Sequence, residues 1–263
     1  MQSPKRIGLK ALKEASSIKG EVSSFDLGFK LGPRVNASGR MNSAESAVEL
    51  FISDSMEKAR SLAEQLSREN SSRQKVESDI IKEAIEIIES EPAFEDMGSI
   101  VVSSPDWHQG IIGIVASRIV ERYGKPAILI AIGEDGVGKG SGRSVDGVNI
   151  YQALSECREV LVQYGGHELA AGLSIKQGDI EKFRRMFDLA VKAGTGASER
   201  KLNIDCAVEL SDVSDELVTE LSKLEPFGIG NPEPVLLAQG VEVKSQRLLK
   251  DKHLSVKVSA GGK

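Results

Sequence analysis

The chain has 263 residues, of which 40% are hydrophobic and 28% charged, and its formal net charge is −5. This length allows one large domain or two smaller ones, and the acidic balance argues against a protein that coats nucleic acid through a broad basic surface. No apolar run approaches the ~20 residues of a membrane span, so we expect a cytoplasmic protein without a membrane partner. Cys157 and Cys206 lack the spacing of zinc ligands and are typical of thiols in a reducing compartment.

The N-terminal segment is predicted to contain two short helices, over residues 4–15 and 43–52. Between them lies FDLGFKLGPRVNASGR, residues 25–40. Its alternation favours a brief strand, which should run into a loop because glycine and proline interrupt the pattern.

A much longer helix is predicted next, with Ser53 as its N-cap and Pro92 just beyond its end. Both ends of this stretch carry apolar residues at helical spacing, but the middle segment SRENSSRQK, residues 67–75, is polar on every side. Helices of that kind often bridge two domains through solvent. We therefore interpret residues 55–90 as a spacer helix.

Strands and helices alternate after this helix, which indicates an α/β fold with a mixed sheet. Strands are predicted at residues 99–102, 127–132, 140–144 and 171–175, and helices at 111–123, 150–157 and 180–193. A strand at 202–208 and a helix at 215–224 precede LEPFGIGNPEP, whose prolines and glycines predict a domain boundary. The remaining residues alternate as strands but are too few to close a barrel.

The segment GKGSGRSVDG, residues 138–147, is the first candidate binding motif. It places Ser141, Arg143 and Ser144 at a strand end cleared by glycines. A guanidinium flanked by hydroxyls and accessible N–H groups suits a phosphate. The alternative is a simple hairpin with a solvated arginine.

The segment YGGHELAAGLS contains the second candidate, in which Gly165 and Gly166 precede His167. The glycines allow a close backbone approach, and the imidazole could bond a phosphate, stack on a base or transfer a proton. A tight turn followed by a packed histidine explains the same pattern.

Two further segments carry weaker signals. GPRVNASGR offers Arg34, Asn36, Ser38 and Arg40 to an anion, although a structural turn fits equally well. PDWHQG sets Trp107 and His108 before a helix start, where free N–H groups could take an anion, but a packed tryptophan is the commoner case. The sequence contains no HExxH, no Asp-x-Asp pair, no adjacent histidines and no GxxxxGK[ST], so no metal site is predicted in this chain.

In this order and with these gaps, LGPRVNASGRM, WHQGIIGIVASRIVERYGKPAILI, SGRS, YGGHELAAG and LEPFGIGNPEP resemble the RecJ family of single-strand-specific exonucleases, in the DHH phosphoesterase superfamily. The resemblance covers nearly the whole chain. It implies the tail of a DHH domain at 1–52, a connecting helix at 53–91, a DHH-associated substrate-binding domain at 92–224, a linker at 225–232 and the start of an OB-fold at 233–263.

The resemblance also implies a function. The parent protein would hydrolyse single-stranded DNA from its 5′ end with two Mn²⁺ or Mg²⁺ ions, which this chain would not hold, so the chain alone should be inactive. Arg40 would lie at the scissile phosphate with Asn36 near it. Ser141, Arg143 and Ser144 would bind the 5′ end, and Gly165, Gly166 and His167 would contact a nucleotide.

Partners implied by the resemblance are single-stranded DNA, repair proteins and single-strand-binding proteins. Two alternatives stay open. One is a DHH-family enzyme for oligoribonucleotides or cyclic dinucleotides, which shares the GGH motif. The other is a non-enzymatic adaptor that uses the long helix and the α/β domain to hold a partner protein.

Overall fold

The computed structural model describes residues 5–41, 43–194, 202–228, 230–249 and 253–260. It divides the chain into two compact units, Met1–Ser198 and Glu199–Lys263. No helix in these described ranges is both long enough and apolar enough to cross a membrane.

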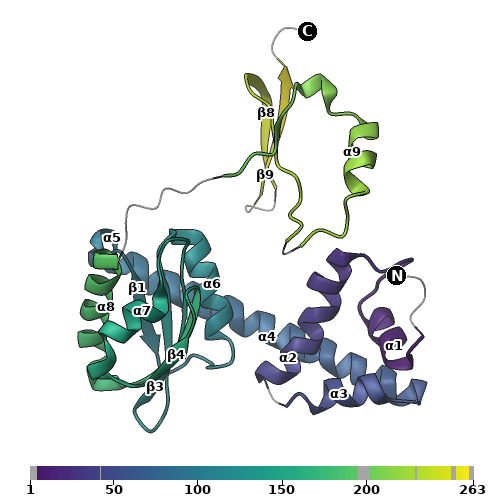
Figure 1. The fold of residues 1–263 in the computed structure, drawn as a ribbon. Helices are drawn as coiled ribbons and strands as arrows, with labels where there is room; N and C mark the ends of the chain where they lie inside the picture. The colour runs from purple at the N-terminus through teal and green to yellow at the C-terminus, as the bar shows by residue number, and fades with distance from the viewer. Residues whose placement is uncertain (1–4, 42, 195–201, 229, 250–252, 261–263) are drawn as a thin grey trace. The chain divides into compact units, whose positions relative to one another are not determined.

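The first unit begins with short helices that pack on the start of a long one (Figure 1). These are α1 (Ile7–Ala15), the π-helical turn η1 (Asp26–Leu31), α2 (Gly32–Met41) and α3 (Glu45–Ile52). Ala11, Leu12 and Leu50 are buried against Ala59, Ala63 and Leu66 of the long helix. This cluster is the core of the N-terminal helical part.

The predicted strand and loop over residues 25–40 are wrong, because this segment is helical. A proline inside an α-helix removes one hydrogen bond and clashes with the carbonyl four residues earlier. Here a π-helical turn, Asp26–Leu31, ends two residues before Pro33, so the irregular helix geometry lies next to the proline. Ala37 and Ser38 are fully buried, so packing against the long helix outweighs the weak helix propensity of the segment.

The predicted long helix is confirmed as α4 (Met56–Ser90), but its N-cap is Ser55 rather than Ser53. The Ser55 hydroxyl accepts a hydrogen bond from the Lys58 N–H at 3.4 Å, which satisfies one free donor of the first turn. The polar middle of α4 does not simply cross solvent. Asn70 and Arg73 are buried there, and Arg73 forms an ion pair with Glu77 at 2.6 Å.

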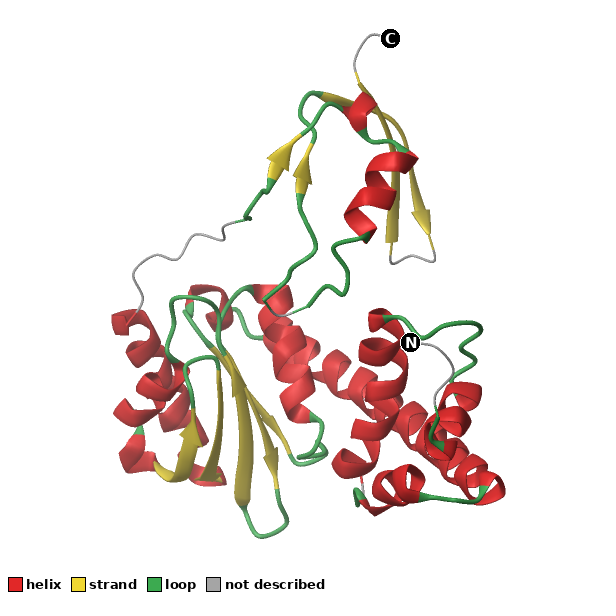
Figure 2. Cartoon of the chain, turned by 45° about the vertical axis from the view of Figure 1, so that its right-hand side comes forward, coloured by secondary structure: helices red, strands yellow, loops and turns green. Residues whose placement is uncertain are grey.

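A mixed sheet follows, as predicted, and it has five strands (Figure 2). Its order is β1-β2-β3-β5-β4, with β1 and β2 parallel and the other neighbours antiparallel. The strands are β1 (Ile100–Ser104), β2 (Ala127–Ile132), β3 (Val137–Arg143), β4 (Leu161–Gly166) and β5 (Ala170–Lys176). The edge strand β4 was not predicted, because the glycines of GGH favoured a turn.

Helices cover the sheet unequally. On one face, α4 and α6 (Ile112–Tyr123) pack on β1 and β2; on the other, α7 (Ile150–Glu156) and α8 (Ile180–Gly194) cover the remaining apolar side. Three short elements complete this unit, α5 (Ala93–Asp96), η2 (Arg158–Val160) and η3 (Gln177–Asp179). On the α6 side, β3, β5 and β4 carry the short and polar side chains described below.

The second unit contains two small sheets. Its elements are β6 (Cys206–Ala207), η4 (Leu210–Asp212), α9 (Asp215–Ser222), β7 (Leu236–Leu237), β8 (Val241–Leu249) and β9 (His253–Ala260). The strands β6 and β7 pair in parallel, and β8 and β9 form an antiparallel hairpin.

The predicted linker at 225–232 does not coincide with the division between the units. Because β6 pairs with β7 across this segment, both of its flanks belong to the second unit. The Asn231 side chain donates to the carbonyls of Leu224 and Pro226 at 2.9 and 3.0 Å, so the segment is a hydrogen-bonded turn. Residue 229 of this linker and the end of the predicted OB segment, 261–263, lie outside the described residues.

Candidate nucleic-acid interface

The alternation of side chains along β3 creates the polar surface of the site. Glycines on its inner face meet the core closely, since a Cβ on Gly140 would lie 2.8 Å from Leu173 and one on Gly142 would lie 2.7 Å from Ile150. Successive residues of a strand point to opposite faces. Lys139, Ser141 and Arg143 therefore point away from this core, towards the side of the sheet on which α6 lies.

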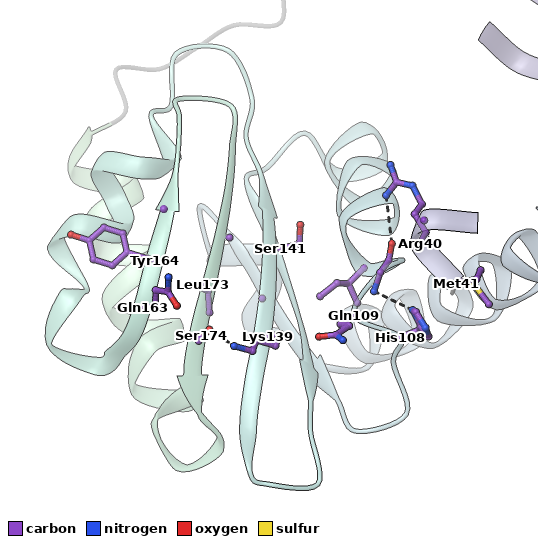
Figure 3. A pocket seen from close by; sticks show the side chains of 16 residues that line it. Arg40, Met41, His108, Gln109, Lys139, Ser141, Gln163, Tyr164, Leu173 and Ser174 are labelled. Atoms are coloured by element: carbon purple, nitrogen blue, oxygen red, sulfur yellow. Dashed lines mark hydrogen bonds between the residues drawn. The ribbon is translucent and has the colours of Figure 1, made fainter. Parts of the chain in front are cut away.

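An open cleft of about 800 Å³ lies on that side (Figure 3). One wall comes from the end of α2 and the loop before α6, with Arg40, His108 and Gly110. The floor comes from β3, β5 and β4, whose cross-strand pairs bring Ser141 beside Gly172 and Gly172 beside Gly165. The predicted residues Arg40, Ser141 and Gly165 thus meet in one cleft.

Close backbone approach joins the two walls. A Cβ on Gly110 would lie 2.2 Å from the carbonyl oxygen of Arg40, so only glycine lets this loop reach the end of α2. The Arg40 guanidinium donates to the Gly110 carbonyl at 3.5 Å, and the Gly110 N–H donates to Nδ1 of His108 at 3.1 Å. These contacts hold Arg40 at the rim of the cleft.

Arg143 lies beside the cleft and is held by its own strand. Its Nη1 donates to the carbonyl of Gly142 at 2.7 Å and to Oγ of Ser141 at 3.3 Å. Burial, and to a smaller extent the like charge of Arg40, lower the pKa of the Arg143 guanidinium from its ordinary value. Two arginines from distant segments are therefore close enough to repel each other, which an anion between them would relieve.

The cleft carries positive charge without a counterion. No residue that lines it in the described part of the chain is acidic, although the sequence has 39 acidic residues. Arg40, Arg143 and Lys139 have no carboxylate within ion-pair distance among the described residues. Positive charge and serine hydroxyls on a glycine-rich surface suit the binding of phosphate groups.

Besides Arg143, the predicted residues Ser144, Gly166 and His167 also lie outside this lining. Ser144 Oγ donates to the Val148 carbonyl at 2.6 Å, which is a structural contact within the loop. His167 is exposed after β4, where its Nδ1 accepts from the Leu169 N–H at 3.4 Å. Gly166 has a φ of +145°, and a Cβ there would lie 2.4 Å from the Ala170 carbonyl oxygen, so this position requires glycine.

Asn36 lines a neighbouring hollow of about 540 Å³ between α2, α4 and α6. Arg40 lines this hollow too, so α2 brings the two residues to the same hollow. The polar residues Arg73 and Glu77 of α4 form its opposite side. Arg34, by contrast, is bound to the Lys30 carbonyl and the Ser67 hydroxyl, and Ser38 is buried, so neither faces the cleft.

Lys139 was not among the predicted site residues, and His108 was expected in a structural turn, but both line the cleft. Trp107 is packed as expected, with 5% of its surface exposed and its Nε1 donating to Glu83 at 2.8 Å. The neighbouring His108 instead faces the cleft. Lys139 could have been found from its position two residues before Ser141, because residues two apart on a strand point to the same face.

The residues present do not fit a divalent metal ion. Within the described ranges, no three His, Cys, Asp or Glu side chains converge on a common point. Carboxylates and imidazoles are the groups that bind Mg²⁺ and Mn²⁺. No catalytic step through a metal ion is therefore derived for this chain.

Comparisons with known proteins identify two domains in this chain. Residues 97–193 match the DHHA1 domain and residues 204–263 match the RecJ OB domain. The chain is 37% identical over 260 residues to the single-stranded-DNA-specific exonuclease RecJ of Bacillus subtilis, covering 97% of this chain and 33% of that protein. It is 34% identical over 266 residues to RecJ of Escherichia coli, covering 98% of this chain and 46% of that protein.

Solved structures share the fold of this chain. The crystal structure of Thermus thermophilus RecJ in complex with Mn²⁺ has a TM-score of 0.84 at 29% identity, covering 98% of this chain and 39% of that one. A crystal structure of exonuclease RecJ bound to manganese has a TM-score of 0.62 at 30% identity, covering 71% of this chain and 45% of that one.

The chain spans between a third and a half of the length of these curated relatives, 33% in one case and 46% in another. Both of its matched domains occur in the order expected from the sequence. With a DHHA1 domain followed by a RecJ OB domain, the chain belongs to the RecJ family.

Proposed function

We propose that the cleft between α2, α6 and β3 binds the sugar–phosphate backbone of single-stranded DNA for a RecJ-type exonuclease. The observation that carries this proposal is the cleft lined by Arg40, Lys139 and Ser141 without a single acidic residue among the described lining, in a chain of net charge −5. Such local concentration of positive charge selects an anionic ligand, whereas the acidic remainder of the chain disfavours non-specific coating.

The proposal assigns roles within the site. Ser141 and Arg143 bind the 5′-terminal phosphate, because their hydroxyl and guanidinium lie on the same face of β3. Ser144, adjacent in the chain, completes the predicted pocket by fixing the loop after this strand. A nucleotide could approach the protein backbone along β4 and the turn after it, at Gly165, Gly166 and His167.

Arg40 is proposed to contact the scissile phosphate, with Asn36 close to it. Support comes from the position of Arg40, which lines both the cleft and the neighbouring hollow that contains Asn36. A guanidinium can bond two oxygens of one phosphate and stabilise charge that develops on it. The helices up to residue 52 would thus be the tail of a DHH domain, and residues 53–91 its connection to the DHHA1 domain.

The proposed parent activity is 5′→3′ hydrolysis of single-stranded DNA with two Mn²⁺ or Mg²⁺ ions, which would activate water and stabilise the leaving oxygen. Among the described residues, the cleft offers groups suited to phosphate, but no three His, Cys, Asp or Glu side chains gather where they could hold a metal ion. The chain alone is therefore proposed to bind DNA without cleaving it. Repair proteins and single-strand-binding proteins are proposed partners of the parent.

The test is a titration of this chain with 5′-phosphorylated and 5′-hydroxyl single-stranded oligodeoxynucleotides, with Mn²⁺ present and cleavage followed on a gel. Binding that prefers the 5′-phosphate, without cleavage, supports the proposal. Equal binding of a matched oligoribonucleotide or a cyclic dinucleotide would favour a different DHH-family substrate. DNA binding that tolerates both Arg143→Ala and His167→Ala would favour the adaptor alternative, and cleavage would contradict the assignment of an inactive chain.

A further inference from the structure

A lysine on β3 extends the phosphate-binding surface beyond the residues assigned above. Lys139, Ser141 and Arg143 occupy alternate positions of this strand, so their side chains leave the same face of the sheet. Lys139 pairs across the sheet with Ser174 of β5, and Ser174 pairs with Gln163 of β4. All three of these residues line the cleft.

The ammonium of Lys139 is available to a ligand. Its Nζ donates to Oγ of Ser174 at 2.9 Å, which fixes the end of the side chain over the strand beside it. The side chain is exposed, and no carboxylate of the described residues lies within ion-pair distance of it. An ammonium has three N–H donors, so two remain for an anion after the bond to Ser174.

The spacing along β3 fits a chain of nucleotides. Alternate residues of a strand lie ~6.6 Å apart, which is similar to the distance between neighbouring phosphates of an extended nucleotide chain. Ser141 lies between Lys139 and Arg143 on β3. It pairs across the sheet with Gly172, which in turn pairs with Gly165, so these three residues form a row across the strands. This row has no bulky side chain, so a sugar or base between two phosphates could lie against the sheet.

Resting on the proposed function, we infer that Lys139, positioned by Ser174, binds the second phosphate of the DNA strand while Ser141 and Arg143 hold the first. The consequence is a minimal ligand with two phosphates. A mononucleotide would fill only the subsite at Arg143, whereas a 5′-phosphorylated dinucleotide would fill both. Lys139 therefore distinguishes a nucleotide chain from a single nucleotide.

The experiment compares two ligands, thymidine 5′-phosphate and the 5′-phosphorylated thymidine dinucleotide, by NMR titration of this chain and of its variants. The wild-type chain should bind the dinucleotide ~10-fold more tightly, as expected for one additional hydrogen bond between charged groups. Lys139→Ala should remove this difference and leave the affinity for the mononucleotide within about twofold. Lys139→Arg should retain most of it, because the positive charge remains.

Matched variants separate the inference from the function on which it rests. Arg143→Ala should weaken both ligands, whereas Lys182→Ala, which removes an exposed lysine paired with Glu159 on the other side of the domain, should weaken neither. Equal loss of both ligands in Lys139→Ala, or no loss of either, would overturn the second subsite while leaving phosphate binding intact. Failure of the wild-type chain to bind either ligand would overturn both the proposed function and the inference.

Discussion

Arg143 and Arg40 come from segments more than 100 positions apart, yet they lie close enough for the charge of Arg40, after the larger effect of burial, to lower the pKa of Arg143. No carboxylate among the described residues neutralises either guanidinium. Holding like charges together costs free energy unless an anion binds between them. The pair is therefore preorganised for a phosphate group, and each arginine can be tested separately.

The first prediction concerns Arg143→Gln, which removes the charge but keeps a polar, unbranched side chain. It should lower the affinity of this chain for a 5′-phosphorylated oligonucleotide at least ~10-fold, since bonds to charged groups contribute ~1.5–3 kcal/mol. Affinity for the 5′-hydroxyl oligonucleotide should fall much less. Fluorescence anisotropy with labelled oligonucleotides measures both affinities. The slope of the logarithm of the binding constant against the logarithm of the salt concentration should become shallower by ~0.7, because one phosphate contact is lost.

The control for this prediction is Arg68→Gln, which removes an exposed arginine from α4 that lies 3.9 Å from Glu64. This variant should bind both oligonucleotides like the wild-type chain. A 5′-phosphate preference that survives in Arg143→Gln would exclude Arg143 from the terminal-phosphate site. Lost binding of both oligonucleotides in Arg68→Gln would instead point to a non-specific charge effect.

The second prediction concerns Gly113, the second residue of α6. Alanine is favoured over glycine in a helix by ~1 kcal/mol, but a Cβ here would lie 2.8 Å from Oγ of Ser141 and 3.3 Å from Nη2 of Arg143. Gly113→Ala should therefore displace these two side chains and lower affinity for the 5′-phosphate. It should gain none of the stability that the propensity scale predicts.

Gly28→Ala is the matched control, because no atom lies within 4 Å of a Cβ at that helical position. It should raise the free energy of unfolding by ~0.5–1 kcal/mol and leave DNA binding unchanged. Urea titrations and anisotropy measurements on both variants make the comparison. If Gly113→Ala were as stable as Gly28→Ala and bound DNA normally, α6 would not constrain Ser141 and Arg143 as described.

The third prediction concerns the two cysteines. Burial, with smaller contributions from Glu156 and Glu159, raises the pKa of the Cys157 thiol from 9.0 to about 11, whereas Cys206 is exposed. The thiolate is the reactive form. Iodoacetamide at pH 8 should therefore modify Cys206 alone in the folded chain and both cysteines in urea, as mass spectrometry can show. Rapid modification of Cys157 without denaturant would contradict its burial.

The raised pKa also predicts how stability depends on pH. The folded thiol keeps its proton to a higher pH than the unfolded thiol, so the contribution of Cys157 is constant below about pH 9 and declines as the pH rises towards 11. Cys157→Ala should be less stable at neutral pH because it leaves a small cavity. The difference between the two chains should narrow above pH 9, and a constant difference would argue against this linkage.

Sequence periodicity was sufficient for the regular parts of the fold. The apolar run at 127–132 and the amphipathic pattern at 180–193 both form the expected elements, because their burial patterns are simple. It failed at 32–40 and at 161–166, where glycine, proline and serine signalled loops but tertiary packing and cross-strand pairing stabilise a helix and an edge strand.

The candidate site was predictable in part for a related reason. Arg40, Ser141 and Gly165 could be named from motifs, but their meeting in one cleft depends on strand register and on the close approach at Gly110. Lys139 was missed because its role follows from pairing with Ser174 on a strand 35 residues away in sequence. Motifs identify reactive groups, whereas register decides which of them face the same ligand.

The last prediction concerns Asp188, which anchors α8 to the start of β1. Its buried Oδ1 accepts from the N–H groups of Gly98 and Ser99 at 2.7 and 3.1 Å, and its Oδ2 pairs with Lys192 at 2.7 Å. Asp188→Ala leaves two N–H donors without this acceptor and should lower the free energy of unfolding by about 3 kcal/mol. Asp188→Asn keeps one carbonyl acceptor and should cost less.

Trp107 provides the measurement, because it is the single tryptophan of the chain and is buried in the same unit as Asp188. Its fluorescence during urea unfolding reports the stability of that unit alone. Asp54→Ala, at an exposed aspartate before α4, is the control and should stay within ~0.5 kcal/mol of the wild-type chain. Since Asp188 lies outside the cleft lining, folded Asp188→Asn should bind 5′-phosphorylated DNA normally. Weakened binding in that variant would mean that the anchor between α8 and β1 also positions the phosphate site.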